Sequence, residues 1–235
     1  MSIAWEMIIK YKKEKGYMKK TMLAASLLFV SAAFASNAFS TAIQYSSGLS
    51  TPLSEAIVYD FETNIVGPLV GPYTLGVLGT VTSTTNSIIS NVSNGDGAQP
   101  AGDVSKYLSV KGGGQTTITL SNPNNYYFGL YWGSIDLYNT ITFSFNNNKQ
   151  LSFGGFDVTN PVAANGNQQS PGTNKYVGFN FSDAITSVTF YSGSNSFEVD
   201  NIAIAPVPEP ATILLFGMGL VGLAGIRRRK QKLSR

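Results

Sequence analysis

Two apolar segments, each beside a cluster of basic residues, limit which part of this chain can fold as a water-soluble domain. They span residues 21–35 and 211–226, near the two ends of a 235-residue sequence. Of the 16 lysines and arginines, only four lie in residues 41–205, where ten acidic residues give a net charge of −6. An acidic surface repels the phosphate backbone of nucleic acid. We therefore expect an acidic folded domain between two targeting segments, and no nucleic-acid partner.

The N-terminal segment begins with the basic region that is typical of a secretory signal peptide. Met18 is followed directly by Lys19 and Lys20, and the apolar run starts at the next residue. Residues 1–17 are then an upstream extension, so both Met1 and Met18 are candidates for the native start.

The apolar run itself, TMLAASLLFVSAAFA, has 15 residues and ends in small side chains. Roughly 20 apolar residues are needed to span a bilayer, so a removable signal peptide fits this run better than a permanent membrane anchor, which is the alternative. We predict export through the Sec translocon and cleavage by signal peptidase after Ala35 or Ala38. Residues 1–38 would then be absent from the exported protein.

The C-terminal segment has the features of a short transmembrane helix. Residues 211–226 are uncharged and largely apolar, and as a helix they would span about 24 Å. The basic cluster that follows should stay in the cytoplasm. Pro208 and Pro210 keep the preceding backbone extended, which suits a protease that grips an unfolded strand. The alternative is a plain C-terminal membrane anchor.

Three ordered features of residues 206–235 resemble the PEP-CTERM sorting signal. They are a Pro-Glu-Pro motif, a glycine-rich membrane helix and a terminal arginine cluster, and their key residues are Val207, Pro208, Glu209, Pro210, Arg227, Arg228 and Arg229. The resemblance implies cleavage near Pro-Glu-Pro by exosortase, a transient stay in the inner membrane, and transfer to the surface of a Gram-negative bacterium. It also implies an association with exopolysaccharide, biofilm or floc formation.

The middle of the chain, residues 39–205, has the pattern of an all-β domain. Apolar and polar residues alternate in short runs such as 117–120, 141–146, 177–181 and 188–190. Clusters of glycine, asparagine and serine separate these runs, as turns between short strands would require. We predict one antiparallel β-sandwich or jelly-roll ectodomain, flanked by the signal peptide and the transmembrane helix.

The chain has no cysteine and no histidine. Disulfides, cysteine-ligated zinc and iron–sulfur clusters are therefore excluded, as are Ser-His-Asp and Cys-His catalytic systems. A bound metal would have to be a cation that prefers oxygen ligands, such as Ca²⁺.

One candidate calcium site follows from an irregularity in the last predicted strand. Phe197 and Val199 occupy odd positions, whereas Ile202 and Ile204 occupy even ones, so a bulge near Asp200 is needed to send all four inward. A jelly roll often brings its first and last strands together, which would bring three carboxylates around one ion: Asp60, Glu62 and Asp200. The alternative is that these are ordinary solvated strand carboxylates.

The aromatic run at residues 126–133 is a candidate glycan-binding strand. Tyr127 and Tyr131 share one face with two glycines, and an aromatic ring over flat backbone can stack on a sugar. With Trp132 they are the expected glycan contacts, and the alternative is core packing. Residues 127–140 and 197–203 also resemble a group of exosortase-dependent surface proteins, a likeness that carries little known function.

We interpret the chain as an exported, non-catalytic surface or matrix protein that is held in exopolysaccharide and binds glycan. One alternative is a secreted glycan hydrolase with two carboxylates, for which Glu198 and Asp136 are the first pair to consider. Another alternative is an ice- or surface-adhesion protein, suggested by threonines at 82–85 and 116–117, although the sequence shows no regular T-x-T ladder.

Overall fold

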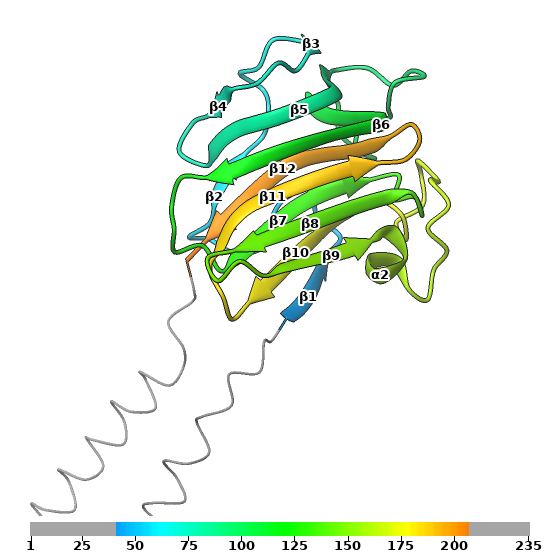
Figure 1. Cartoon of the computed structure of the whole chain (residues 1–235). Coiled ribbons are helices and arrows are strands. Elements are labelled where there is room, and N and C mark those ends of the chain that lie inside the picture. The colour runs from blue at the N-terminus through cyan, green and yellow to red at the C-terminus, as the bar shows by residue number, and fades with distance from the viewer. Residues whose placement is uncertain (1–40, 207–235) are drawn as a thin grey trace, which may run out of the picture. The chain divides into compact units, whose positions relative to one another are not determined.

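The computed structural model describes residues 41–206 of the chain. This segment is almost entirely β-structure (Figure 1), with a single short helix among the described residues, α2 (Gly155–Thr159). The strands are β1 (Thr41–Ser46), β2 (Ile57–Tyr59), β3 (Gly67–Pro68), β4 (Tyr73–Leu75), β5 (Gly79–Ser90), β6 (Tyr107–Leu120), β7 (Tyr127–Gly133), β8 (Asn139–Phe145), β9 (Gln150–Gly154), β10 (Lys175–Phe181), β11 (Ile185–Ser192) and β12 (Phe197–Ala205).

All twelve strands belong to one antiparallel sheet. Its main path runs β1-β10-β7-β12-β6-β11-β8-β9, while β5 extends the sheet from β6. Strand β12 joins the two halves, because its first residues pair with both β6 and β7 and its last residues pair with β7 and β2. The all-β prediction is confirmed. In place of two separate sheets, however, the structure has one continuous sheet.

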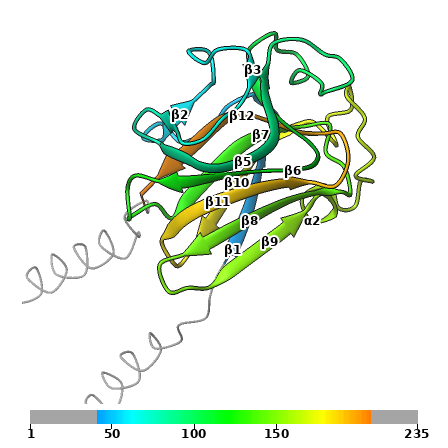
Figure 2. The ribbon, with the colours of Figure 1, turned by 45° about the horizontal axis from the view of Figure 1, so that its top comes forward.

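This sheet curls until its two ends face each other across the core. Strands β8 and β10 are not hydrogen-bonded neighbours, yet the rings of Phe143 and Phe179 lie 4.9 Å apart. Phe128 of β7 also contacts Phe143, at 5.6 Å between ring centroids. Figure 2 shows strands β6, β11, β8 and β9 passing in front of β10 and β1. The half-barrel thus encloses a core rich in phenylalanine, which suits a domain without disulfides.

The predicted alternation of apolar and polar residues matches the burial pattern of β8. In β8, the side chains of Asn139, Ile141, Phe143 and Phe145 point inward, and the residues between them are only partly buried. Strand β7 differs, because all seven of its residues are buried. Strand β7 lies inside the sheet, between β10 and β12. Because its side chains are buried on both faces of the sheet, other segments of the chain must cover each face at this point.

The predicted bulge in β12 is present. The register between β12 and β7 shifts between Asp200 and Ala203, and Asn201 has a φ of +46°. Asparagine is among the few residues that adopt this left-handed conformation readily. As a result Phe197, Val199 and Ile202 are all fully buried despite their mixed parity.

Candidate functional site

A polar pocket of about 340 Å³ lies where four connecting segments meet. These segments are the β5–β6 connection, the β7–β8 turn, the loop between α2 and β10, and the β11–β12 turn with the start of β12. Hydroxyl, amide and carboxyl groups dominate its lining, which consists of Asn94, Gly95, Gly97, Ser134, Asp136, Tyr138, Asn165, Gly166, Gln168, Asn195, Ser196 and Glu198. The pocket therefore contains both members of the carboxylate pair that the sequence singled out, Asp136 and Glu198.

Glu198 is the buried centre of the pocket wall. Its side chain is 2% exposed, and its Oε2 accepts a hydrogen bond of 2.5 Å from the Ser134 hydroxyl. Its Oε1 accepts a bond of 3.1 Å from the Ala98 backbone N–H and another from the Ser196 hydroxyl. Burial raises the pKa of Glu198 to about 7, and these three donors oppose the shift.

The three donors to Glu198 come from three different segments of the pocket wall. Ala98 belongs to the β5–β6 connection, Ser134 to the β7–β8 turn and Ser196 to the β11–β12 turn. One carboxyl group therefore holds these segments at fixed positions around the pocket. Removing it would leave three donors without this acceptor, which is costly inside a protein.

Buried Asn139 strengthens the same junction. Its Oδ1 accepts a hydrogen bond from the Asp136 backbone N–H at 2.9 Å. Its Nδ2 donates to the Ser192 hydroxyl at 3.0 Å and to the Ser196 carbonyl at 3.1 Å. The β7–β8 turn is thus fixed to the β11–β12 turn, which positions Asp136 at the pocket.

Asp136 is the more accessible carboxyl group of the pocket. The Tyr138 hydroxyl lies 2.5 Å from Asp136 Oδ2 and 2.6 Å from the Asn195 carbonyl oxygen. Partial burial raises the pKa of Asp136, although the hydrogen bond from Tyr138 opposes the shift. Burial and the neighbouring Asp136 raise the pKa of Tyr138.

The pocket lining contains no lysine or arginine. A lysine near the β5–β6 connection, Lys111, forms an ion pair of 3.3 Å with Asp96. The residues that line the pocket thus carry only acidic charge. Such a lining favours neutral or cationic ligands over anionic ones.

The structure brings only part of the predicted calcium site together. Strand β2 pairs with β12 through Tyr59 and Ile202, so the chain reaches Asp60 beside the bulge that contains Asp200. Glu62 instead accepts a hydrogen bond of 2.6 Å from the Lys106 backbone N–H. Within residues 41–206 there is no group of three or more acidic side chains arranged to hold a metal ion.

Asp200 accepts its hydrogen bonds from groups of the protein itself. It is fully buried, and it accepts hydrogen bonds from the Ser105 hydroxyl at 2.8 Å and from the Asn201 backbone N–H at 2.6 Å. Burial raises its pKa to about 7, opposed by these two bonds, while the negative charges of Asp103 and Asp60 raise it further.

The aromatic face that was expected to contact glycan is covered. Tyr127, Tyr131 and Trp132 are at most 3% exposed. Leu49 and Leu53, from the segment between β1 and β2, pack against the buried cluster that contains the two tyrosines. None of the three rings can therefore stack on a sugar in this structure, and this expectation is corrected.

The glycines beside these tyrosines make room for the protein's own rings. A Cβ placed on Gly129 would lie 2.3 Å from the Tyr176 hydroxyl and 2.5 Å from the Tyr127 hydroxyl. Gly178 approaches the Tyr127 ring in the same way, at 2.8 Å. On the opposite side of the strand, Trp132 stacks on Phe197 with 4.4 Å between ring centroids. The flat, glycine-cleared backbone thus serves core packing.

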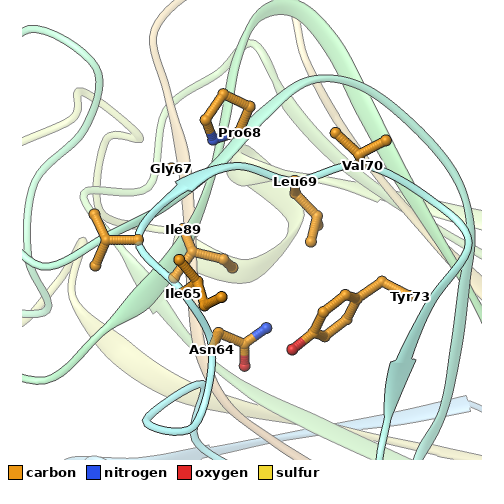
Figure 3. Close-up of a pocket in the computed structure, with 9 residues that line it drawn as sticks. Asn64, Ile65, Gly67, Pro68, Leu69, Val70, Tyr73 and Ile89 are labelled. Carbon is orange, nitrogen blue, oxygen red and sulfur yellow. The ribbon is translucent and has the colours of Figure 1, made fainter.

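A second hollow, of about 360 Å³, is mostly apolar (Figure 3). It lies beside β3 and β4, and the side chains of Leu69, Tyr73 and Ile89 surround it. Ile65 and Val70 at its rim are 89% and 73% exposed. The residues that line this hollow include no acidic or basic side chain, so it offers no group for acid–base chemistry.

Hydroxyl side chains form cross-strand rows on the outer face of the sheet. Thr117 of β6 and Thr189 of β11 are paired in register, and their hydroxyl oxygens lie 2.8 Å apart. Thr142 of β8 continues the row and contacts the Ser152 hydroxyl of β9, also at 2.8 Å. The ladder that the sequence did not show along one strand therefore exists across four strands.

The predicted sorting residues, Val207 to Pro210 and Arg227 to Arg229, lie outside the described residues, as do Ala35 and Ala38. Residues 206–230 match the family model of the PEP-CTERM protein-sorting motif. The chain carries a PEP-CTERM sorting motif. This motif marks an exported, exosortase-sorted protein that is associated with the membrane or surface of a Gram-negative bacterium.

No curated protein matches the chain. Within residues 41–206, no helix is long and apolar enough to cross a membrane. The predicted transmembrane helix at 211–226 lies outside this range.

Proposed function

We propose that this protein is a non-catalytic component of the cell surface or extracellular matrix, and that its β-domain binds glycan in the polar pocket. The PEP-CTERM motif supports the location, because it directs the chain to exosortase. The pocket supports the binding role, because its walls present the hydroxyl, amide and carboxyl groups that hydrogen-bond to sugar hydroxyls. Exopolysaccharide is the glycan that an exported matrix protein would meet.

The hydrogen bonding of Glu198 argues against a hydrolase. In glycan hydrolysis one carboxyl group must give its proton to the leaving oxygen, while the other acts on the sugar or on water. Glu198 is almost completely buried, and both of its oxygens accept bonds from protein donors. We therefore assign Glu198 a structural role.

A glycan array tests the binding role directly. Gln168 is an exposed residue of the pocket lining, so Gln168→Trp should obstruct the pocket and abolish retention of glycan. Gln169 is also exposed but does not line the pocket, and Gln169→Trp is the matched control. The proposal fails if the wild-type protein binds no glycan, or if Gln168→Trp binds as the wild type does.

The cross-strand hydroxyl rows favour surface adhesion as a second candidate function. The pairs Thr117–Thr189 and Thr142–Ser152 hold their hydroxyl groups in fixed positions on neighbouring strands. Ordered hydroxyl groups of this kind suit contact with ice or another ordered solid. Loss of ice-recrystallisation inhibition in Thr189→Val would support this role, while an inactive wild-type protein would remove it.

A further inference from the structure

Around Tyr138 in the polar pocket, there are more hydrogen-bond acceptors than donors. The Tyr138 hydroxyl is within hydrogen-bonding distance of both Asp136 Oδ2 and the Asn195 carbonyl, at 2.5 and 2.6 Å. A hydroxyl group carries one proton and can satisfy one of these acceptors well, but not both. Among the described residues, no other side chain or backbone group donates to the Asp136 carboxylate.

The same place lacks a positive charge. Asp136 forms no ion pair with any residue in 41–206, and the pocket lining offers no basic side chain. The titratable groups that interact electrostatically with the buried acid Glu198 are Tyr107 and Tyr138, neither of which is a cation. The positive charge of Lys111 is already paired with Asp96. Partial burial of a carboxylate without a neighbouring cation costs free energy. The positive charge of a cationic ligand would offset this cost.

We propose that the pocket selects glycans with free amino groups, and that the ligand's ammonium group binds from the pocket side, donating to the Asp136 carboxylate and the Asn195 carbonyl, the two acceptors that share the Tyr138 proton. An ammonium group brings three donors and one positive charge, which are the two things that this site lacks. The inference rests on the proposed glycan-binding function and adds the class of sugar.

The remaining lining groups suit the rest of an amino sugar. Asn94, Asn165 and Gln168 also line the pocket, and side-chain amides both donate to and accept from sugar hydroxyls. Gly166 packs against the Asp136 carboxylate so closely that a Cβ there would lie 2.4 Å from Oδ2. The carboxylate therefore lies against bare backbone, with no neighbouring side chain in the way at this point. A uronic acid would instead place its carboxylate against Asp136 and Glu198.

Titration calorimetry on the protein as exported from producing cells tests the selection. The probes are a glucosamine oligosaccharide, its N-acetylated counterpart of the same length and linkage, an oligogalacturonate and trilysine. We expect the glucosamine oligosaccharide to bind about tenfold more tightly than the N-acetylated one, since a charge-assisted bond replaces a neutral contact. The oligogalacturonate should not bind.

Two variants locate the effect. Asp136→Asn should remove the tenfold preference and keep the binding of the N-acetylated probe, because an asparagine still accepts the bond from Tyr138. Asp183→Asn is the matched control; Asp183 accepts a bond from Asn147 in a separate turn and should have no effect when replaced.

The results separate this inference from the proposed function. Equal affinity for the two related oligosaccharides in the wild-type protein overturns the inference while leaving glycan binding intact, and so does a preference that survives in Asp136→Asn. Tight binding of trilysine overturns the sugar class. Binding of none of the oligosaccharides overturns the proposed function as well. The wild-type comparison needs no variant, so it holds even if Asp136→Asn fails to fold.

Discussion

Glu198 should make this domain less stable as the pH rises, and replacing it should remove that dependence. Its pKa is about 7 in the folded protein, against 4.5 for an ordinary glutamate. Between these values the folded protein keeps a proton that the unfolded chain has lost. Stability is then greatest below about pH 4.5 and is lost progressively as the pH rises to about 7.

The size of this loss of stability follows from the pKa shift of Glu198. A difference of about 2.5 pKa units corresponds to about 3 kcal/mol of unfolding free energy, at 1.36 kcal/mol per unit. This is a large fraction of the 5–15 kcal/mol that is typical of a folded domain. This free-energy value applies to Glu198 without a reduction for solvent screening, because the residue is only 2% exposed.

Glu198→Gln is the variant that isolates the effect. Glutamine keeps an acceptor for the Ala98 N–H, and the Ser134 hydroxyl can turn from donor to acceptor. The buried network thus survives without a titrating group. Asp200, whose pKa is also raised to about 7, still titrates in the variant, so the difference between the two proteins belongs to Glu198.

Denaturant unfolding of both proteins between pH 4.5 and 8 measures the difference. We expect the unfolding free energy of the wild-type protein to fall by about 3 kcal/mol more than that of Glu198→Gln over this range. Parallel pH profiles for the two proteins would refute the reasoning, because they would show that Glu198 ionises in the folded state as it does in water.

Three further predictions concern the fold. Phe143→Ala should lower the free energy of unfolding, measured with denaturant, by about 3–5 kcal/mol, because its ring is fully buried. Phe156 is 53% exposed, so Phe156→Ala should lower it far less, and similar losses for the two variants would contradict the assigned core. Gly129→Ala should lower the melting temperature because its Cβ would meet two tyrosine hydroxyls at 2.5 Å or less, whereas Gly95→Ala meets nothing within 4 Å; equal melting temperatures would argue against this packing. Asn201→Val should cost about 1–2 kcal/mol by the same unfolding assay, since a β-branched residue disfavours a φ of +46°, and an unchanged stability would argue against the bulge.

Local patterns in the sequence predict the strands and the bulge well. Alternation along residues 141–146 identifies β8, because one face of that strand meets the core and the other meets solvent. The change of parity between Val199 and Ile202 predicts the register shift in β12, since buried side chains must point to one side whatever the backbone does.

Long-range features are not encoded in such patterns. The burial of Tyr127 and Tyr131 depends on the segment around Leu49 and Leu53, which is more than 70 residues away in the chain. The continuous sheet likewise depends on β12 changing neighbours along its length, which its own residues do not reveal. Pairing between distant segments therefore decides both outcomes.

The polar pocket illustrates the same limit. The turn-forming sequences at 94–97, 165–167 and 192–194 are recognisable as turns, but their convergence at one place follows only from the curl of the sheet. The sequence singled out Asp136 and Glu198 as a catalytic pair, and the structure places both at the pocket with different surroundings. The dense hydrogen bonding of Glu198 depends on Ala98 and Ser134, which no spacing rule connects to it.

Intact mass of the product recovered from outside the cell tests the central claim, that this is an exported domain released from two targeting segments. The PEP-CTERM motif at residues 206–230 and the N-terminal signal pattern predict a polypeptide that begins after Ala35 or Ala38 and ends near Pro210, with any added glycan visible as extra mass. Recovery of the uncut 25.1 kDa chain from the cytosol would contradict it.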